Sequence, residues 1–146
     1  MEARRIPATH RILLAVDLTD ASSGAVVEAI ELAAANEAEL VVLTVVEPSN
    51  LRMPGGRTRR VDQERDRLEA GARDIVGRAR GAGVSATYLI WEGDPAESIL
   101  DASISEDADL IVLGSRGRTN LRRLLLGSVS SAVARRASCE VVVIPT

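Results

Sequence analysis

Five short runs of Val, Ile and Leu recur along the chain, and in most of them the apolar residues follow one another without alternating polar positions. Continuous apolar runs of this length are typical of strands that are covered on both faces of a parallel sheet. The strands expected from these runs cover residues 11–17, 39–46, 87–92, 109–113 and 140–144.

Segments with the spacing of amphipathic helices lie between the runs. The expected helices cover residues 25–36, 63–80, 95–104 and 129–137, and Asp94 and Pro95 form a cap and first turn for the third. Strands that alternate with helices form right-handed βαβ crossovers. The pattern therefore predicts an α/β fold, an open five-stranded parallel sheet with helices on both faces. A length of 146 residues fits one domain spanning 1–146.

Three other features have a functional and a plain interpretation. Residues 49–62 contain Pro54, two glycines and four arginines, which predicts an exposed connection; it is a lid or slack, and we favour slack. Residues 81–86 carry the letters of a dinucleotide fingerprint but follow a helix and precede a strand, so we expect a helix cap and a turn. We expect Tyr88 and Trp91 to pack in the core or against a helix rather than to stack on bases.

The composition excludes several classes of site. A single cysteine and a single histidine exclude an intramolecular disulfide and the usual zinc sites. All 18 basic residues are arginine, so a Walker P-loop and Schiff-base chemistry, which need lysine, are excluded as well. The net charge of -3 gives no reason to expect nucleic acid or an anionic membrane as a partner. Residues 1–10 lack the apolar centre of a signal peptide and no run is long enough to cross a bilayer, so we expect a cytoplasmic protein.

The stretch 110–130 joins an apolar strand to a helix through three spaced glycines, Gly114, Gly117 and Gly127. Glycine lets the backbone turn tightly and approach a ligand closely, and the free N–H groups at the start of a helix bind phosphate oxygens. Spacing alone leaves two interpretations open, a phosphate cradle and ordinary turns between a strand and a helix.

Ligands of open α/β sheets bind beyond the carboxyl ends of the strands, where the strand order reverses. Asp17 and the loop after Gly114 both follow such ends, and they face each other across one crevice if their strands are neighbours. Asp17 as a helix cap is the alternative. His10 and Cys139 each precede a strand, so we expect both at the amino edge of the sheet, away from the crevice.

From residue 11 to residue 145 the chain resembles the universal stress proteins in four motifs that occur in the same order. The pattern Gly-x2-Gly-x9-Gly-Ser that begins at Gly114 has the form of that family's ATP-binding signature. The run Ile-Leu-Leu-Ala-Val before Asp17 is similar to its first strand and acidic residue. The Gly-Asp-Pro turn that begins at Gly93 and the Val-Val-Val-Ile run before Pro145 are similar to the turn after its third strand and to its last strand.

This resemblance implies a Rossmann-like sheet, similar to that of the adenine nucleotide alpha hydrolases, with strand order 3-2-1-4-5 and ATP where the order reverses. Asp17 would bind the ribose or adenine side, and the backbone of Val45 would hydrogen-bond adenine. The residues implied around the phosphates are Gly114, Arg116, Gly117, Arg118, Gly127, Ser128, Val129 and Ser130. For the two arginines, a solvated position in the loop is the alternative. A Mg or Mn ion would bridge the phosphates.

The resemblance also implies a homodimer that pairs through the strand Glu140–Ile144. The residues themselves favour the same pairing, because an apolar strand left unpaired at the edge of a sheet invites association.

We therefore expect an ATP-binding regulatory module of the stress response, in which nucleotide occupancy changes the loops around the crevice and a surface for an unidentified protein partner. Two alternatives stay open, a slow ATPase or phosphotransferase and a nucleotide-free interaction protein. Efficient catalysis is not expected, because His10 lies at the wrong edge to act as a general base and no lysine exists to stabilise a transferring phosphoryl group. No residue is assigned a catalytic role.

Overall fold

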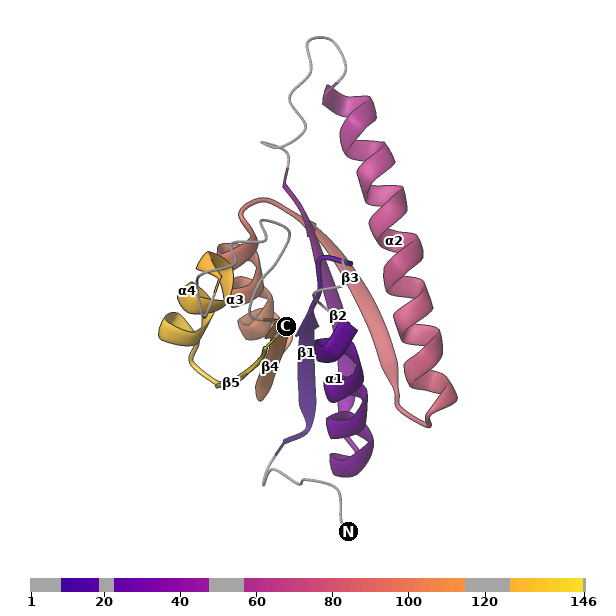
Figure 1. Cartoon of the computed structure of the whole chain (residues 1–146), viewed down its shortest axis with the longest axis vertical. Helices are drawn as coiled ribbons and strands as arrows, with labels where there is room; N and C mark the ends of the chain where they lie inside the picture. Colours follow the sequence, from indigo (N-terminus) through magenta and orange to yellow (C-terminus); the bar gives the residue numbers. More distant parts are fainter. Residues whose placement is uncertain (1–8, 19–22, 48–56, 115–126, 146) are drawn as a thin grey trace.

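The computed structural model of the chain describes residues 9–18, 23–47, 57–114 and 127–145, with side chains for all of these except 57–60. The described helices are α1 (Ser23–Asn36), α2 (Arg57–Gly81), α3 (Pro95–Ser105) and α4 (Ser128–Arg136). The strands are β1 (Arg11–Ala15), β2 (Glu39–Val46), β3 (Ala86–Glu92), β4 (Leu110–Gly114) and β5 (Glu140–Ile144). They form one parallel sheet in the order β3-β2-β1-β4-β5, which confirms the α/β fold and the strand order (Figure 1).

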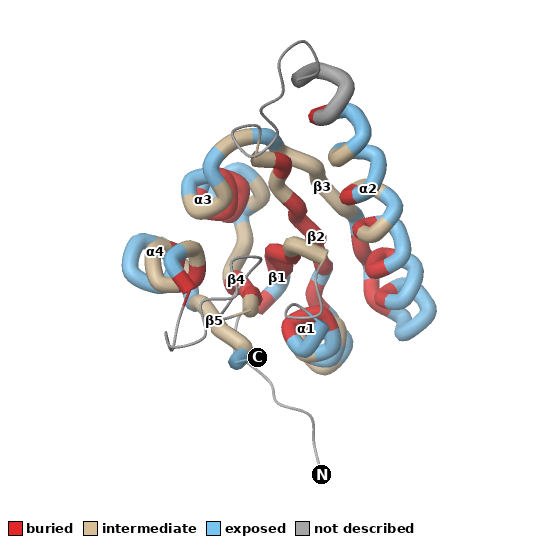
Figure 2. Tube along the Cα trace, turned by 45° about the horizontal axis from the view of Figure 1, so that its top comes forward, coloured by how far each residue is buried: buried red, intermediate tan, exposed pale blue. Residues whose placement is uncertain are grey.

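Helices cover both faces of this sheet. Helices α1 and α2 pack on one face, and α3 and α4 pack on the other (Figure 2). Along β1, the central strand, Ile12 and Leu14 belong to the first of these two clusters, whereas Leu13 and Ala15 belong to the second. Both sets of side chains are buried, which explains why the strand appears in the sequence as one continuous apolar run.

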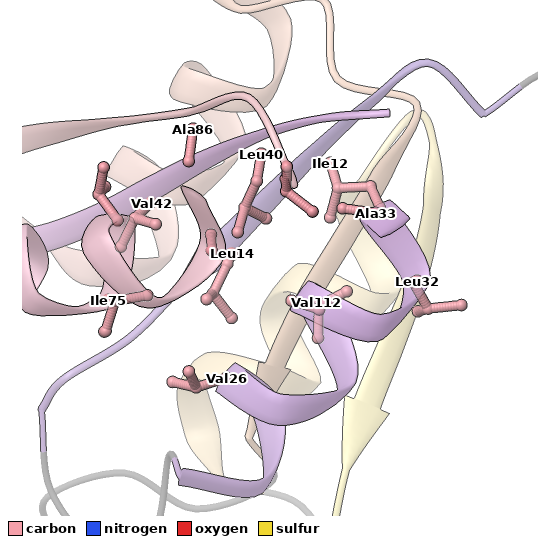
Figure 3. Packing of buried hydrophobic residues seen from close by; sticks show 14 of the residues in the cluster. Ile12, Leu14, Val26, Leu32, Ala33, Leu40, Val42, Ile75, Ala86 and Val112 are labelled. Atoms are coloured by element: carbon pink, nitrogen blue, oxygen red, sulfur yellow. The ribbon is translucent and has the colours of Figure 1, made fainter. Parts of the chain in front are cut away.

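The core beneath α1 and α2 is centred on three neighbouring strands. Leu14 of β1 lies beside Val42 of β2 and Val112 of β4, with which it pairs in register. Figure 3 shows these side chains in one cluster with Val26 of α1 and Ile75 of α2. The middle of β1 is therefore enclosed on its sides by strands and above by two helices.

Helix α2 is longer than expected from the sequence, because it begins at Arg57 rather than at residue 63. Val61 is buried and packs with Val46 and Leu68, so the apolar stripe of the helix continues toward its N-terminus. The prediction of a connection over 49–62 was thus wrong for its last six residues. The glycines and the proline that favoured a loop, residues 54–56, directly precede the helix. Residues 48–56, and with them the choice between a lid and slack, lie outside the described part of the chain.

The other bounds agree with the expected ones to within two residues, the usual uncertainty of a helix or strand end. Asp94 caps α3, because its Oδ2 accepts from the amide of Glu97 at 3.0 Å, and Pro95 occupies the first turn. Residues 81–86 form a cap and turn, as expected: Gly83 adopts φ +85°, and the amide of Val84 donates to the carbonyl of Ala79 at 3.0 Å.

Both aromatic residues pack against helices, as expected. The hydroxyl of Tyr88 donates to Oε2 of Glu69 on α2 at 2.6 Å, and Trp91 packs against the cluster beneath α3 and α4. None of the helices in the described ranges is long and apolar enough to cross a membrane.

Candidate functional site

The carboxyl ends of β1 and β4 lie side by side in the middle of the sheet, with Ala15 next to Leu113. Helix α1, the next helix after β1, packs on one face of the sheet, and α4, the next helix after β4, packs on the other (Figure 1). We call this position the switch point, because strand order reverses there, and it is where open α/β sheets bind ligands. The adjacency of the two strands, on which the candidate site depended, is confirmed.

Backbone groups at the end of β2 face the switch point. In a parallel strand the N–H and C=O of a residue point to the same side, and the side alternates from residue to residue. The amide of Val16 donates to the carbonyl of Leu43 at 3.0 Å, and the amide of Gly93 donates to the carbonyl of Val46 at 2.9 Å. The backbone groups of Leu43 thus point toward β1, and those of Val46 point toward β3. The N–H and C=O of Val45 must then point to the β1 side, beyond the last residue of β1.

The side chain of Val45 is not available to a ligand in the same way, because it packs against the cluster beneath α3 and α4. Its neighbour Thr44 lies in the buried interior, and the hydroxyl of Thr44 has no hydrogen-bond partner among the described residues. The end of β2 therefore presents a main-chain donor and a main-chain acceptor side by side.

Asp17 lies two residues beyond β1 and is half-buried. The pKa of Arg67 on α2 is raised above its ordinary value, chiefly by hydrogen bonds to Glu64, with further contributions from the charges of Glu64 and Asp17. The carboxylate of Asp17 is therefore within electrostatic range of α2. The next residue, Leu18, adopts φ +62°, a left-handed conformation that is uncommon for leucine.

The start of α4 lies at the same carboxyl edge of the sheet, because α4 connects the parallel strands β4 and β5. Gly127 is the N-cap and offers no side chain to the first turn, and its carbonyl accepts from the amide of Ser131 at 2.9 Å. The N–H groups of the first helical turn have no partner within the helix. Ser128 is exposed, whereas Ser130 is buried and its hydroxyl donates to the carbonyl of Gly127 at 3.2 Å. The side chain of Val129 packs in the core, so its backbone is the part that can reach a ligand.

Gly114 is the last residue of β4, paired with Ile144 of β5. Arg116, Gly117 and Arg118 lie outside the described residues. Within the ranges that the structure describes, no three His, Cys, Asp or Glu side chains are grouped so as to hold a metal ion.

The opposite edge of the sheet holds His10 and Cys139, as expected. The backbone amides of His10 and Arg11 donate to Oδ2 of Asp109 at 2.7 and 3.0 Å, which ties the start of β1 to the start of β4. His10 and Cys139 line an open hollow of about 640 Å³ at this amino edge. Burial, and to a smaller extent the charge of Asp109, raises the pKa of the Cys139 thiol. Neither residue belongs to the switch point.

Residues 8–145 match the family model described as "Universal stress protein family". The chain belongs to the universal stress protein family. A curated member, universal stress protein YxiE of Bacillus subtilis, is 31% identical over 92% of this chain and 98% of its own length.

Solved structures of the family share the fold. Universal stress protein UspA from Lactobacillus plantarum superposes with a TM-score of 0.85 at 30% identity, covering 93% of this chain and 97% of that one. A universal stress protein in complex with cAMP superposes with a TM-score of 0.71 at 27% identity, covering 95% of this chain and 98% of that one.

Leu18 and Arg67 border the site, although neither was selected from the sequence. A leucine in a left-handed conformation leaves no signal in a sequence, because asparagine or glycine is the usual residue there. Arg67 lies in a helix with many alternating charges, where nothing distinguishes it before the helix is placed beside β1.

Proposed function

We propose that this chain is a cytoplasmic ATP-binding module whose nucleotide occupancy regulates a protein partner in the stress response. The observation that carries the proposal is that main-chain groups are available at the carboxyl edge of the sheet: the N–H and C=O of Val45 at the end of β2, and the amides in the first turn of α4. The structural neighbour in complex with cAMP supports an adenine nucleotide as the ligand.

The adenine end of the site would be formed by Val45 and Asp17. Adenine carries a hydrogen-bond donor, its amino group, next to ring nitrogen acceptors. The adjacent C=O and N–H of Val45 complement that edge without using a side chain. Asp17, at the end of the neighbouring strand, would accept hydrogen bonds from the ribose or from the base.

The phosphate end would be formed by the start of α4 and the loop before it. The amides of Ser128, Val129 and Ser130 and the positive end of the helix dipole favour an anion. Because the hydroxyl of Ser130 already donates to Gly127, its amide is the expected donor. The remaining proposed contacts are Gly114, Arg116, Gly117 and Arg118. A Mg or Mn ion would take its ligands mainly from phosphate oxygens and water.

Regulation is favoured over turnover because the groups that phosphoryl transfer needs are missing from the chain or lie elsewhere. The sequence has no lysine, and its one histidine, His10, lies at the amino edge. Turnover by purified protein that disappears in Asp17→Ala would instead support the slow ATPase or phosphotransferase.

The proposal is tested by nucleotide identification and by a variant at Gly127. Purified protein is denatured, and mass spectrometry of the released small molecules is expected to detect ATP. Gly127 is buried, and its φ of −71° and ψ of 168° are extended angles that valine adopts without backbone strain, so Gly127→Val is expected to fold, which circular dichroism checks. Its side chain would stand before the first amides of α4. We expect calorimetry to show that ATP affinity falls by at least about 100-fold, about 2.7 kcal/mol.

The matched control is Gly77→Ala, because a Cβ at Gly77 on α2 meets no atom within 4 Å. This variant is expected to bind ATP as the wild type does. Unchanged ATP affinity in Gly127→Val would contradict the assignment of α4. A protein that releases no nucleotide and shows no ATP binding would favour the nucleotide-free interaction module.

We also propose that the chain forms a homodimer through β5. This strand lies at the edge of the sheet, and among the described residues its outer side has no strand partner. The ladder register assigns the backbone groups of Val143 to that outer side and those of Val142 to β4, by the same alternation that places Val45. A half-buried apolar edge strand is a template for pairing with a second copy.

Proline variants distinguish the two sides of β5. Val143→Pro removes an outward amide and leaves the ladder with β4 in place, so we expect a folded monomer by light scattering at micromolar concentration. Val142→Pro removes an amide that faces β4 and is expected to destabilise the fold itself. A monomeric wild type, or a dimeric Val143→Pro, would refute pairing through this edge.

A further inference from the structure

Leu18 and Gly71 fit together at the border of the switch point. A Cβ added at Gly71 of α2 would lie 2.5 Å from Cδ1 and 3.0 Å from Cδ2 of Leu18. The side chain of Leu18 therefore occupies the space that any larger residue at position 71 would need. It also packs against the cluster of Val46, Val61 and Leu68, so both strand and helix hold it.

Each residue of this contact has a conformational cost of its own. Leu18 adopts φ +62°, and a left-handed conformation costs a residue with a Cβ about 1 kcal/mol. Gly71 lies in the interior of a helix, where glycine is about 0.5–1 kcal/mol less favourable than alanine. Local backbone strain of this kind persists where the surrounding structure enforces it, and it occurs often at functional sites.

The contact lies directly beside the carboxylate of the proposed site. Asp17 and Leu18 are consecutive, and Arg67 and Gly71 are four residues apart on α2, so they lie on one face of the helix. The charge of Asp17 acts on Arg67, while the side chain of Leu18 fills the space over Gly71. Two consecutive residues just after β1, Asp17 and Leu18, thus interact with successive turns of α2.

We propose that Leu18 and Gly71 are positioning residues of the nucleotide site: Leu18, inserted over Gly71, holds the backbone turn that presents the carboxylate of Asp17. Helix α2 then sets the affinity for the adenosine part of the nucleotide, whereas α4 sets the affinity for its phosphates. This inference rests on the proposed ATP binding and names the part of the chain that tunes it.

The test compares Gly71→Ala with Gly77→Ala, two identical changes in one helix. The first places a methyl group against Leu18, and the second places it in open space. Calorimetry with ATP and with AMP is expected to show that Gly71→Ala weakens both by the same factor, about tenfold, or about 1.4 kcal/mol. Gly77→Ala is expected to change neither affinity.

A second comparison separates positioning from a general structural effect. Leu18→Ala removes the side chain that holds the turn, so it should weaken ATP and AMP to the same extent as Gly71→Ala. In the double variant Leu18→Ala/Gly71→Ala the added methyl group meets no leucine, so affinity should equal that of Leu18→Ala alone. If Gly71→Ala does not fold, the affinities of Leu18→Ala test the positioning role alone, because this truncation creates no steric clash.

The outcomes distinguish this inference from the proposed function. A wild type that binds neither ATP nor AMP overturns both. A wild type that binds, together with a folded Gly71→Ala or Leu18→Ala of unchanged affinity, overturns the positioning role and leaves ATP binding intact. A loss confined to ATP, with AMP unaffected, overturns it as well, because that pattern belongs to the phosphate end.

Discussion

Truncation of Leu14 to alanine is the most direct test of the packing that supports the switch point. Leu14 is fully buried in the central strand, between Val42 and Val112 and beneath two helices (Figure 3). Core Leu→Ala changes cost about 2.7–5 kcal/mol, depending on how far the surroundings relax into the cavity. Two hydrogen-bonded neighbouring strands hold the backbone of β1 at fixed spacing. We therefore expect about 3–4 kcal/mol, out of the about 5–15 kcal/mol that stabilise a typical domain.

Urea unfolding measures this loss, followed by circular dichroism and by the fluorescence of Trp91, the one tryptophan of the chain. With a denaturant slope of about 2 kcal/mol per molar urea, the midpoint should fall by about 1.5–2 M. Protein concentration is kept constant because dimerisation adds to apparent stability. The control is Val27→Ala on the solvent side of α1, where 46% of Val27 is exposed and the effect should stay within about 0.5 kcal/mol.

A midpoint shift of Leu14→Ala as small as that of Val27→Ala would refute the packing argument. It would mean that the centre of β1 relaxes freely into the space left behind, which a strand held between two others does not allow. A large shift with a changed slope would instead indicate a different unfolded or native state.

Two further predictions concern groups outside the proposed site. Tyr88→Phe removes the hydrogen bond to the carboxylate of Glu69 and should lower the urea-derived stability by about 1 kcal/mol, because this pair is partly exposed; no change would show that water replaces the bond fully. Burial raises the pKa of Cys139 in the folded protein. The stability that the neutral thiol contributes is therefore complete below the pKa that Cys139 has in the unfolded chain, and it is lost as pH rises through the pKa that Cys139 has in the folded protein. Above about pH 8.5 stability should decline less in Cys139→Ser than in the wild type, and Cys139 should react with iodoacetamide more slowly in the folded than in the urea-unfolded protein.

Most of the fold could be predicted from the sequence because this sheet is covered on both faces. Residues such as Leu13 and Leu14 are buried on opposite faces, so the strands appear as uninterrupted apolar runs that are easy to locate. The start of α2 was missed for the opposite reason. Its first turns are charged and follow glycines, and the one residue that reveals the helix, Val61, is buried by contacts with Val46 and Leu68 that exist only in the folded chain.

The candidate site was only partly predictable for a related reason. Its main-chain members follow from the order and register of strands, which the apolar runs and the glycine spacing indicate. The direction of the N–H and C=O of Val45, in contrast, depends on which residues pair across β1, β2 and β3. The contact between Leu18 and Gly71 joins residues far apart in sequence, and neither residue type suggests the other.

Strand β2 extends three residues beyond the end of β1, and this affects which sequence changes the candidate site tolerates. The backbone of Val45 is directed by its place in an alternating ladder, so exchanging its side chain for another that fits the core is expected to leave the proposed adenine end unaltered. Removal of a single residue between Leu40 and Val45 would turn the neighbouring peptide groups toward the opposite strand. At this end of the site, the direction of the backbone groups depends on the number of residues in β2 rather than on the side chain at position 45. A one-residue deletion is therefore expected to disturb it more than a side-chain substitution.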